Sequence, residues 1–241
     1  MIKFFRKIRK SLLIQNKSGK YLKYAIGEIA LVMIGILLAL QVNNWNNIRI
    51  NKKKERAILK ELHIEFLQNK IQLDSVITYH KIAFEGTKKL IALFPIDIKK
   101  INLDSIENYL NDMLSSTFTY NPSQGVINSL ISTSDFDIIS NDNLRKTLIS
   151  WPDLVVDFQE DENDAKNVVI DLIDPVFSKK LDFRFNFTDK RNDLKFLETL
   201  EFEYLIQLRH TYFKSLFKEG AEAENVIKNI DLILNLTKIN D

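Results

Sequence analysis

The chain has 241 residues, with 34 Lys and Arg against 32 Asp and Glu. Its net charge of +2 excludes a disordered polyelectrolyte and a globally basic nucleic-acid binder. Six Gly and four Pro supply few of the tight turns that a sandwich or barrel needs, and the absence of Cys excludes disulfide scaffolds, thiolate metal sites and cysteine nucleophiles. We therefore expect a mainly α fold.

Residues 1–20 read as a basic, amphipathic tail, with apolar side chains at helical spacing and basic side chains on the other face. The apolar set is Ile2, Phe5, Ile8 and Leu12, and the basic set is Lys3, Arg6, Lys7 and Lys10. We expect the basic set to contact anionic lipid at a membrane surface. Membrane lipid, and not nucleic acid, is thus the predicted partner of the tail.

Residues 21–43 are apolar enough and long enough to form a transmembrane helix, because about 20 residues span a hydrocarbon core of about 30 Å. Tyr24 and Trp45 flank the apolar run at residues 25–40 within this segment, as interfacial aromatic anchors do. The end of the apolar run has no pair of small residues two apart, which disfavours a cleaved signal peptide. The pattern predicts an uncleaved, single-pass signal anchor.

Basic residues predict the orientation of this span. Residues 1–23 contain eight Lys or Arg and no acidic residue, against six Lys or Arg between residues 43 and 60. Because positive charge is retained on the cytoplasmic side, we expect the N-terminus in the cytoplasm and the rest of the chain on the periplasmic or extracytoplasmic side of an inner (plasma) membrane.

The apolar run of the span, residues 25–40, contains one charged residue, Glu28, which has two interpretations. In the first, Glu28 lies near the cytoplasmic boundary, where it reaches water or a nearby lysine. In the second, it belongs to a face that packs against a partner span or a second copy. That face comprises Glu28, Val32, Gly35 and Ala39, with Gly35 and Ala39 in a small-xxx-small pattern.

Two sequence stretches are similar to those of an uncharacterised bacterial family of short, single-span proteins, a domain of unknown function. The first comprises FFRKIRK at residues 4–10 and YAIGEIALVMIGILLALQVNNWN at residues 24–46. The second is SLISTSDFDIISNDNLRKTLISW at residues 129–151, where Asp135 stands at a position that is usually Gly in the family. The resemblance implies a membrane-anchored protein but supplies no activity, cofactor or catalytic residue.

After a polar and basic juxtamembrane linker at residues 44–57, residues 58–241 are expected to form a soluble helical bundle. Residues 52–94 predict a long helix with an apolar seam in alternating three-four spacing, either facing the bundle or forming a coiled coil with another chain. Polar residues interrupt this seam at Asn69, His80 and Thr87, and such residues can fix helix register.

Further helices are predicted at residues 103–114, 123–132, 141–150, 153–177, 196–217 and 222–237, with Asn102 or Asp104 as the N-cap of the first. Trp151-Pro152 is interpreted as a helix boundary. Alternation of apolar and polar residues at 117–120 and 181–188 predicts one short, two-stranded β element.

No motif predicts a catalytic, metal or cofactor site. His63, His80 and His210 lack metal-ligand spacing, and the acidic residues between 153 and 174 fit a solvated helix face. The leading hypothesis is therefore a membrane-anchored, non-enzymatic helical interaction or scaffold protein that associates with itself or with a membrane partner. The alternative is a sensor or signal-relay module whose bundle binds a ligand.

Overall fold

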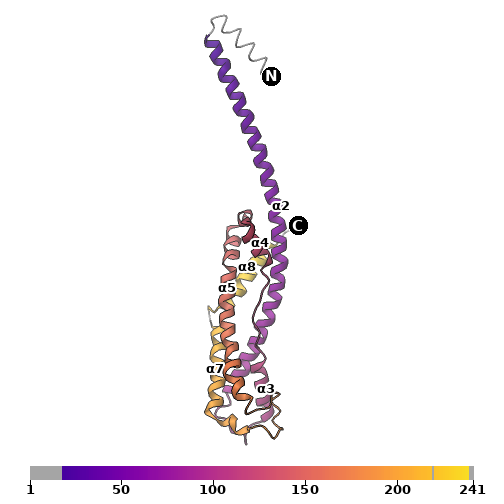
Figure 1. Cartoon of the computed structure of the whole chain (residues 1–241), viewed down its shortest axis with the longest axis vertical. Helices are drawn as coiled ribbons and strands as arrows, with labels where there is room; N and C mark the ends of the chain where they lie inside the picture. The colour runs from indigo at the N-terminus through magenta and orange to yellow at the C-terminus, as the bar shows by residue number, and fades with distance from the viewer. Residues whose placement is uncertain (1–17, 219, 239–241) are drawn as a thin grey trace. The chain divides into compact units, whose positions relative to one another are not determined.

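The computed structural model describes residues 18–218 and 220–238, and the chain divides into two compact units, Met1–Glu55 and Arg56–Asp241. One long helix, α2 (Ser18–Ile91), contributes residues to both units (Figure 1). The expected mainly α fold is confirmed.

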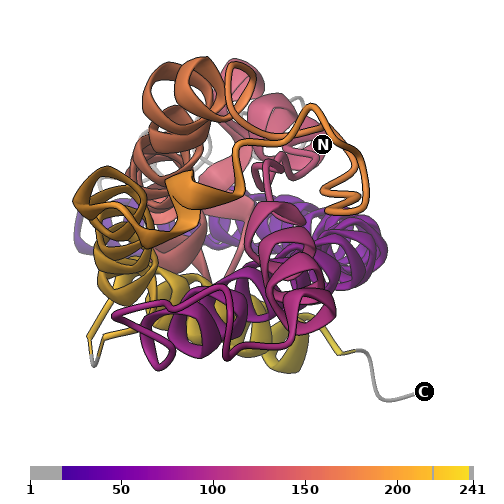
Figure 2. The same cartoon turned by 90° about the horizontal axis from the view of Figure 1, so that it is seen from below.

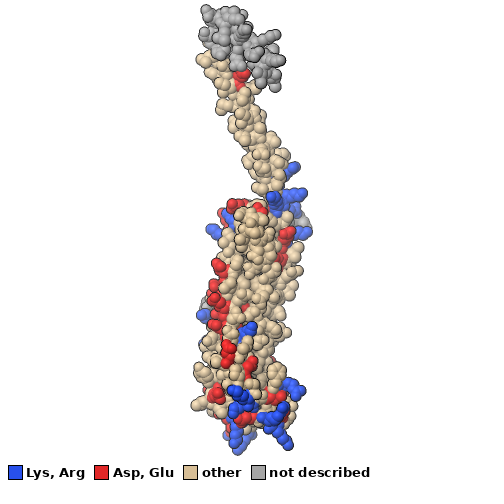
Figure 3. All heavy atoms as spheres, viewed as in Figure 1, with Lys and Arg blue, Asp and Glu red and all other residues tan. Residues whose placement is uncertain are grey.

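In the first unit, the described residues belong to α2, whose apolar stretch is rich in Leu, Ile and Ala. Among the side chains that the structure describes in this unit, none is buried. Lys, Arg, Asp and Glu are sparse along the apolar stretch (Figure 3). Within the described residues, α2 is the one helix that is long and apolar enough to cross a membrane, and its most apolar window is fully unburied.

In the second unit, the seam on α2 becomes one wall of an intramolecular core. The three-four spacing gives eleven seam positions from Leu59 to Phe94, and these two end positions are partly exposed. The nine positions between them are buried, namely Leu62, Phe66, Asn69, Leu73, Val76, His80, Ala83, Thr87 and Leu90. The seam therefore packs within the bundle, as the intramolecular interpretation requires. Figure 2 shows α2 grouped with α5 (Asp142–Asn167), α7 (Leu200–Phe217) and α8 (Glu222–Thr237) around a common axis.

Local capping explains two of the helix starts. The Asn102 side chain accepts a hydrogen bond from the backbone N–H of Asp104 at the start of α3 (Leu103–Leu114), so Asn102 is the N-cap. Asn141 does the same for α5 by accepting from the backbone N–H of Leu144. The remaining elements are α4 (Gly125–Thr133), η1 (Asp135–Ile138), the π-helix η2 (Val168–Ile173), α6 (Asp174–Phe177) and η3 (Leu194–Glu198).

The predicted boundary at Trp151-Pro152 is wrong, because α5 passes through it. Trp151 is fully buried, and its ring meets that of Phe66 edge-on at a centroid distance of 5.0 Å. Pro152 removes its own N–H donor from the helix, and its ring crowds the carbonyl four residues before it. Burial of the large aromatic side chain of the preceding residue, Trp151, offsets that cost.

The predicted two-stranded β element is also wrong: the described residues contain no strand. Residues 181–193 form successive turns, and Phe185 has a φ of 53°, which breaks the alternation that a strand would require. The apolar residues of this loop instead fold inward at Leu181, Phe185 and Phe187, which are buried.

The core of the second unit consists of two apolar clusters. The first joins the middle of α2 to α4, α5, the end of α7 and α8, and the second joins the end of α2 to α3, η2, α6 and the start of α7. Buried polar residues lie where α2 and α7 pass from one cluster to the other. On α7, for example, Arg209 stands between Ile206 of the second cluster and Phe213 of the first.

Candidate functional site

The predicted packing face of the span is open in the first unit. Val32 is 54% exposed, Ala39 is exposed, and no atom lies within 4 Å of a Cβ built on Gly35. Glu28 is partly exposed, and Trp45 is 67% exposed. Of the other predicted contacts, Tyr24 lies in α2 but its side chain is not described, and Lys3, Arg6, Lys7 and Lys10 lie outside the described residues.

In the second unit, the polar seam residues of α2 bind elements that pack on the helix. The Asn69 amide donates to the backbone carbonyl of Ser123 at 2.8 Å and accepts from the Ser123 N–H at 2.8 Å. Thr87 donates to the carbonyl of Phe84, and its hydroxyl lies 3.0 Å from Nδ1 of His210. The buried side chains of Asn69 and Thr87 thus each have a hydrogen-bond partner, as burial demands.

His80 is the centre of a buried polar network. Its Nε2 lies 2.7 Å from Oε1 of Glu162 on α5, and its Nδ1 is hydrogen-bonded to the hydroxyl of Ser116. The second carboxylate oxygen of Glu162 accepts the backbone N–H of Tyr120 at 2.7 Å. Because His80, Ser116 and Glu162 are each at most 3% exposed, these contacts hold α2, α5 and residues 115–121 in one register.

Arg209 extends the polar layer from α7. Its guanidinium donates to the carbonyls of Ala165 and Ser116, the latter at 2.6 Å, and stacks over the ring of Phe213 at 4.1 Å. Burial lowers the pKa of Arg209 to about 9, so the side chain still carries its charge near neutral pH. Ser116 therefore joins His80 through its hydroxyl and Arg209 through its carbonyl.

Burial in this polar layer also affects the ionisation of the Tyr120 phenol. Burial, together with the negative charge of Glu162, raises the pKa of Tyr120. Tyr120 is fully buried, and it therefore remains neutral at physiological pH.

Serine, histidine and glutamate in hydrogen-bonded series are also the groups of a nucleophilic triad. A nucleophile has to reach a substrate, however, and Ser116 is 2% exposed and does not line the pocket described below. The arrangement instead resembles a structural polar layer that aligns helices. Sequence reasoning identified His80 as a register-fixing position but missed Glu162, Ser116 and Arg209, because their partners are up to 93 residues away in the chain.

The acidic residues of α5 separate into two environments. Asp153, Asp157, Glu160 and Asp164 are exposed, as the expectation of a solvated face requires, whereas Asp161 is partly buried. Glu162 is 1% exposed on the same helix. Its position two residues from Glu160 turns it toward the core, since a helix turns by about 100° per residue.

A pocket of about 660 Å³ opens beside the loop formed by residues 178–193. Its apolar wall comprises Leu114, Val169, Phe177, Leu181 and Phe185, and its polar lining comprises Asn111, Thr117, Asp174, Ser178 and Asp182. Phe183 also lines the pocket and is 95% exposed. Val169 belongs to η2, and such π-helical turns frequently accompany functional sites.

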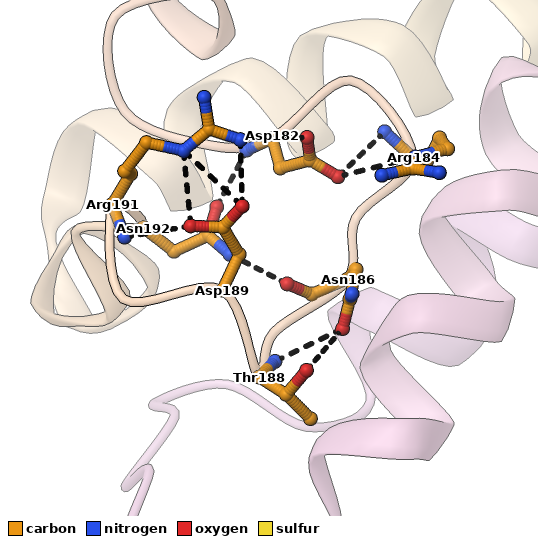
Figure 4. A network of polar contacts seen from close by, with 7 residues as sticks. All are labelled: Asp182, Arg184, Asn186, Thr188, Asp189, Arg191 and Asn192. Carbon is orange, nitrogen blue, oxygen red and sulfur yellow. Dashed lines mark hydrogen bonds and ion pairs between the residues drawn. The ribbon is translucent and has the colours of Figure 1, made fainter.

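Polar contacts hold the loop beside this pocket (Figure 4). Asn192 accepts the backbone N–H of Asp182 at 2.5 Å and donates to the carbonyl of Asn186 at 2.7 Å. Arg191 donates to both carboxylate oxygens of Asp189, with the shortest contact at 2.6 Å. That pairing lowers the pKa of Asp189 to about 2, so it persists over the whole physiological pH range.

A family model described as "Family of unknown function (DUF6090)" matches residues 28–154, which is more than half of the chain. The matched segment begins inside the apolar stretch and ends within α5, so it includes Asn69, His80 and Ser116 but not Glu162 or Arg209. The resemblance to a domain of unknown function is confirmed at this level. No curated protein and no solved structure matches the chain.

Proposed function

The chain belongs to DUF6090, a family of unknown function, and we propose that it is a membrane-anchored, non-enzymatic interaction protein whose helical bundle contacts other protein chains. The supporting observation is the unburied apolar window of α2. Soluble monomers rarely expose a contiguous apolar surface of more than a few hundred Å². A lipid bilayer would cover this window without requiring any change in the bundle.

The length of the apolar stretch suits this role. Residues 21–43 would extend about 35 Å at 1.5 Å per residue, which exceeds a hydrocarbon core of about 30 Å. We propose a single pass through the inner (plasma) membrane, with the N-terminus cytoplasmic and the bundle extracytoplasmic. The excess of basic residues before the span supports this orientation.

A non-enzymatic role is supported by the closed arrangement of the strongest chemical groups. His80, Ser116 and Glu162 use their hydrogen-bonding atoms on one another and on backbone groups. Their burial suits alignment of helices more than access by a substrate.

The sensor or signal-relay role is the second candidate, and the pocket beside residues 178–193 favours it. The two roles differ in what enters that pocket. A small molecule would occupy it in a sensor, and a protein side chain would occupy it in an interaction module. A small molecule that purifies with the chain and raises its melting temperature would support the sensor.

Membrane association can be tested by placing charge in the span. The double substitution Ile34→Lys with Leu37→Lys costs about 2.5–3.5 kcal/mol per charge in a bilayer centre, and it should move the protein from the carbonate-resistant membrane fraction to the soluble fraction. Ile34→Leu with Leu37→Phe is the matched apolar control. Equal partition of both variants into the membrane would contradict the anchor.

Orientation can be tested separately, because the natural chain has no Cys. A single cysteine introduced at Lys190 in the bundle should react with a membrane-impermeant maleimide in intact cells whose outer layers are permeable to the reagent. A cysteine introduced at Lys7 should react only after lysis. The opposite labelling pattern would place the bundle in the cytoplasm.

A further inference from the structure

Phe183 differs from its apolar neighbours in the same loop. Leu181, Phe185 and Phe187 are each at most 8% exposed, whereas Phe183 is 95% exposed. The next residue, Arg184, has a side chain that is 79% exposed. The loop therefore presents an aromatic ring and a cation side by side to solvent.

Polar contacts within the loop fix the conformation that exposes Phe183 and Arg184. The contacts of Asn192 with Asp182 and Asn186 close the loop on itself (Figure 4). Lys180 adds an ion pair with Asp193 at 3.0 Å. A loop already held in one conformation loses little conformational entropy when it binds.

The adjoining pocket has the complementary chemistry. Its wall is apolar, and the charged residues in its lining are two carboxylates, Asp174 and Asp182. Asp182 is only 12% exposed and lies 3.9 Å from Arg184 of its own chain, whereas Asp174 is exposed. The pocket thus suits an aromatic group with a cation beside it, and the loop at its rim displays that pair.

We propose that this surface is an interface between two copies of the chain, in which Phe183 of each copy enters the pocket of the other and Arg184 pairs with Asp174. A projection and a pocket that are adjacent on one surface can meet their counterparts across a two-fold axis, since such an interface places the same patch of both copies together. Aromatic residues and arginine are also the side chains that contribute most to interface stability. The inference rests on the proposed interaction role and names its partner.

The membrane anchor would favour this association further. Two copies in one bilayer share a plane and an orientation, which raises their effective concentration relative to free chains in solution. The bundle interface then needs only modest intrinsic affinity.

The test is sedimentation equilibrium of the full chain in detergent, in a Gly35→Ile, Ala39→Ile background that blocks close packing of the spans. Phe183→Ala and Arg184→Glu should each weaken dimerisation at least tenfold, and Asp174→Arg should restore it when combined with Arg184→Glu. Leu200→Ala is the matched control, because Leu200 is 84% exposed but lies outside the pocket lining. Circular dichroism checks that each variant is folded.

A bismaleimide should also cross-link two copies of a Ser178→Cys variant in membranes, because Ser178 lines the pocket. A monomer at every concentration, or equal association of all variants, would overturn the inference. A small molecule found in the pocket by native mass spectrometry would overturn it in favour of the sensor. Variants that lose dimerisation but stay in the membrane fraction support the interface, whereas loss of the natural chain from that fraction counts against the anchor alone.

Discussion

Gly35 and Gly86 belong to the same helix, yet a methyl group added at each would meet different surroundings. At Gly86 a Cβ would lie 2.6 Å from the backbone nitrogen of Met113 and 2.9 Å from the carbonyl oxygen of Tyr109. At Gly35 no atom lies within 4 Å. Gly86 therefore allows α2 to approach α3 closely, whereas Gly35 has no such neighbour among the residues that the structure describes.

Large apolar side chains show the same contrast. Leu62 and Leu73, in the bundle part of α2, are fully buried, whereas Leu37 and Leu38 of the apolar stretch are 61% and 62% exposed. Leucine side chains of the same helix thus form core in the bundle and solvent-exposed surface in the apolar stretch. The bundle has a core of its own, whereas the described side chains of the apolar stretch include none that is buried.

The largest expected effect comes from breaking the buried network of the bundle. Glu162→Ala leaves His80 and the N–H of Tyr120 without their hydrogen-bond partner, and each buried group left unpaired in this way costs about 1–3 kcal/mol. We expect the free energy of unfolding to fall by that amount for each group. In a Trp45→Phe background, fluorescence of the buried Trp151 during urea unfolding reports on the bundle alone.

Glu160→Ala is the matched control for this measurement. Glu160 lies on the same helix but is exposed, and surface substitutions usually change stability by less than about 0.5 kcal/mol. Equal urea midpoints for Glu162→Ala and Glu160→Ala would contradict a stabilising role for the buried His80 network. They would also show that the buried and exposed faces of α5 contribute equally to stability.

The fold was predictable where local signals coincide with packing. The seam of α2, the N-cap Asn102 and the helix at residues 222–237 follow from spacing and capping, which depend only on neighbouring residues. The boundary at Pro152 failed because burial of Trp151 is a tertiary effect. The strand at 181–188 failed because polar contacts within the loop, rather than a partner strand, decide its backbone.

The candidate sites were less predictable for the same reason. Asn69, His80 and Thr87 were visible as polar interruptions of an apolar seam, so one side of the polar layer could be found from sequence. Ser116, Glu162 and Arg209 are unremarkable in their own segments, and nothing local separates the buried Glu162 from the exposed acids beside it. The pocket combines α3, η2, α6 and a loop, which no local pattern connects.

The second prediction measures the contrast between the two glycines. Gly86→Ala should improve helix propensity by about 1 kcal/mol, but overpacking against the backbone of α3 costs about 1–3 kcal/mol, so we expect a net loss of bundle stability. Gly35→Ala should leave the urea midpoint of the bundle unchanged. A gain in stability for Gly86→Ala would show that α2 and α3 approach less closely than the structure has them.

The smallest expected effect concerns acid sensitivity at His210, whose ring stacks on Phe84 at 5.0 Å. Burial, with the positive charges of Lys214 and Lys88, lowers the pKa of His210 below its ordinary value of 6.5. The unfolded chain then binds a proton more readily than the folded chain, so this residue lowers the stability of the bundle as the pH falls below 6.5. The His210→Phe variant keeps an aromatic ring and removes the titrating group. Between pH 7.5 and pH 5 this variant should therefore lose less stability than the natural chain, as read from urea midpoints.

The Lys214→Ala variant should also lose less stability than the natural chain over this pH range, since it removes one of the charges that lower the pKa of His210. An identical loss in all three proteins would show that protonation of His210 does not differ between the folded and unfolded chains.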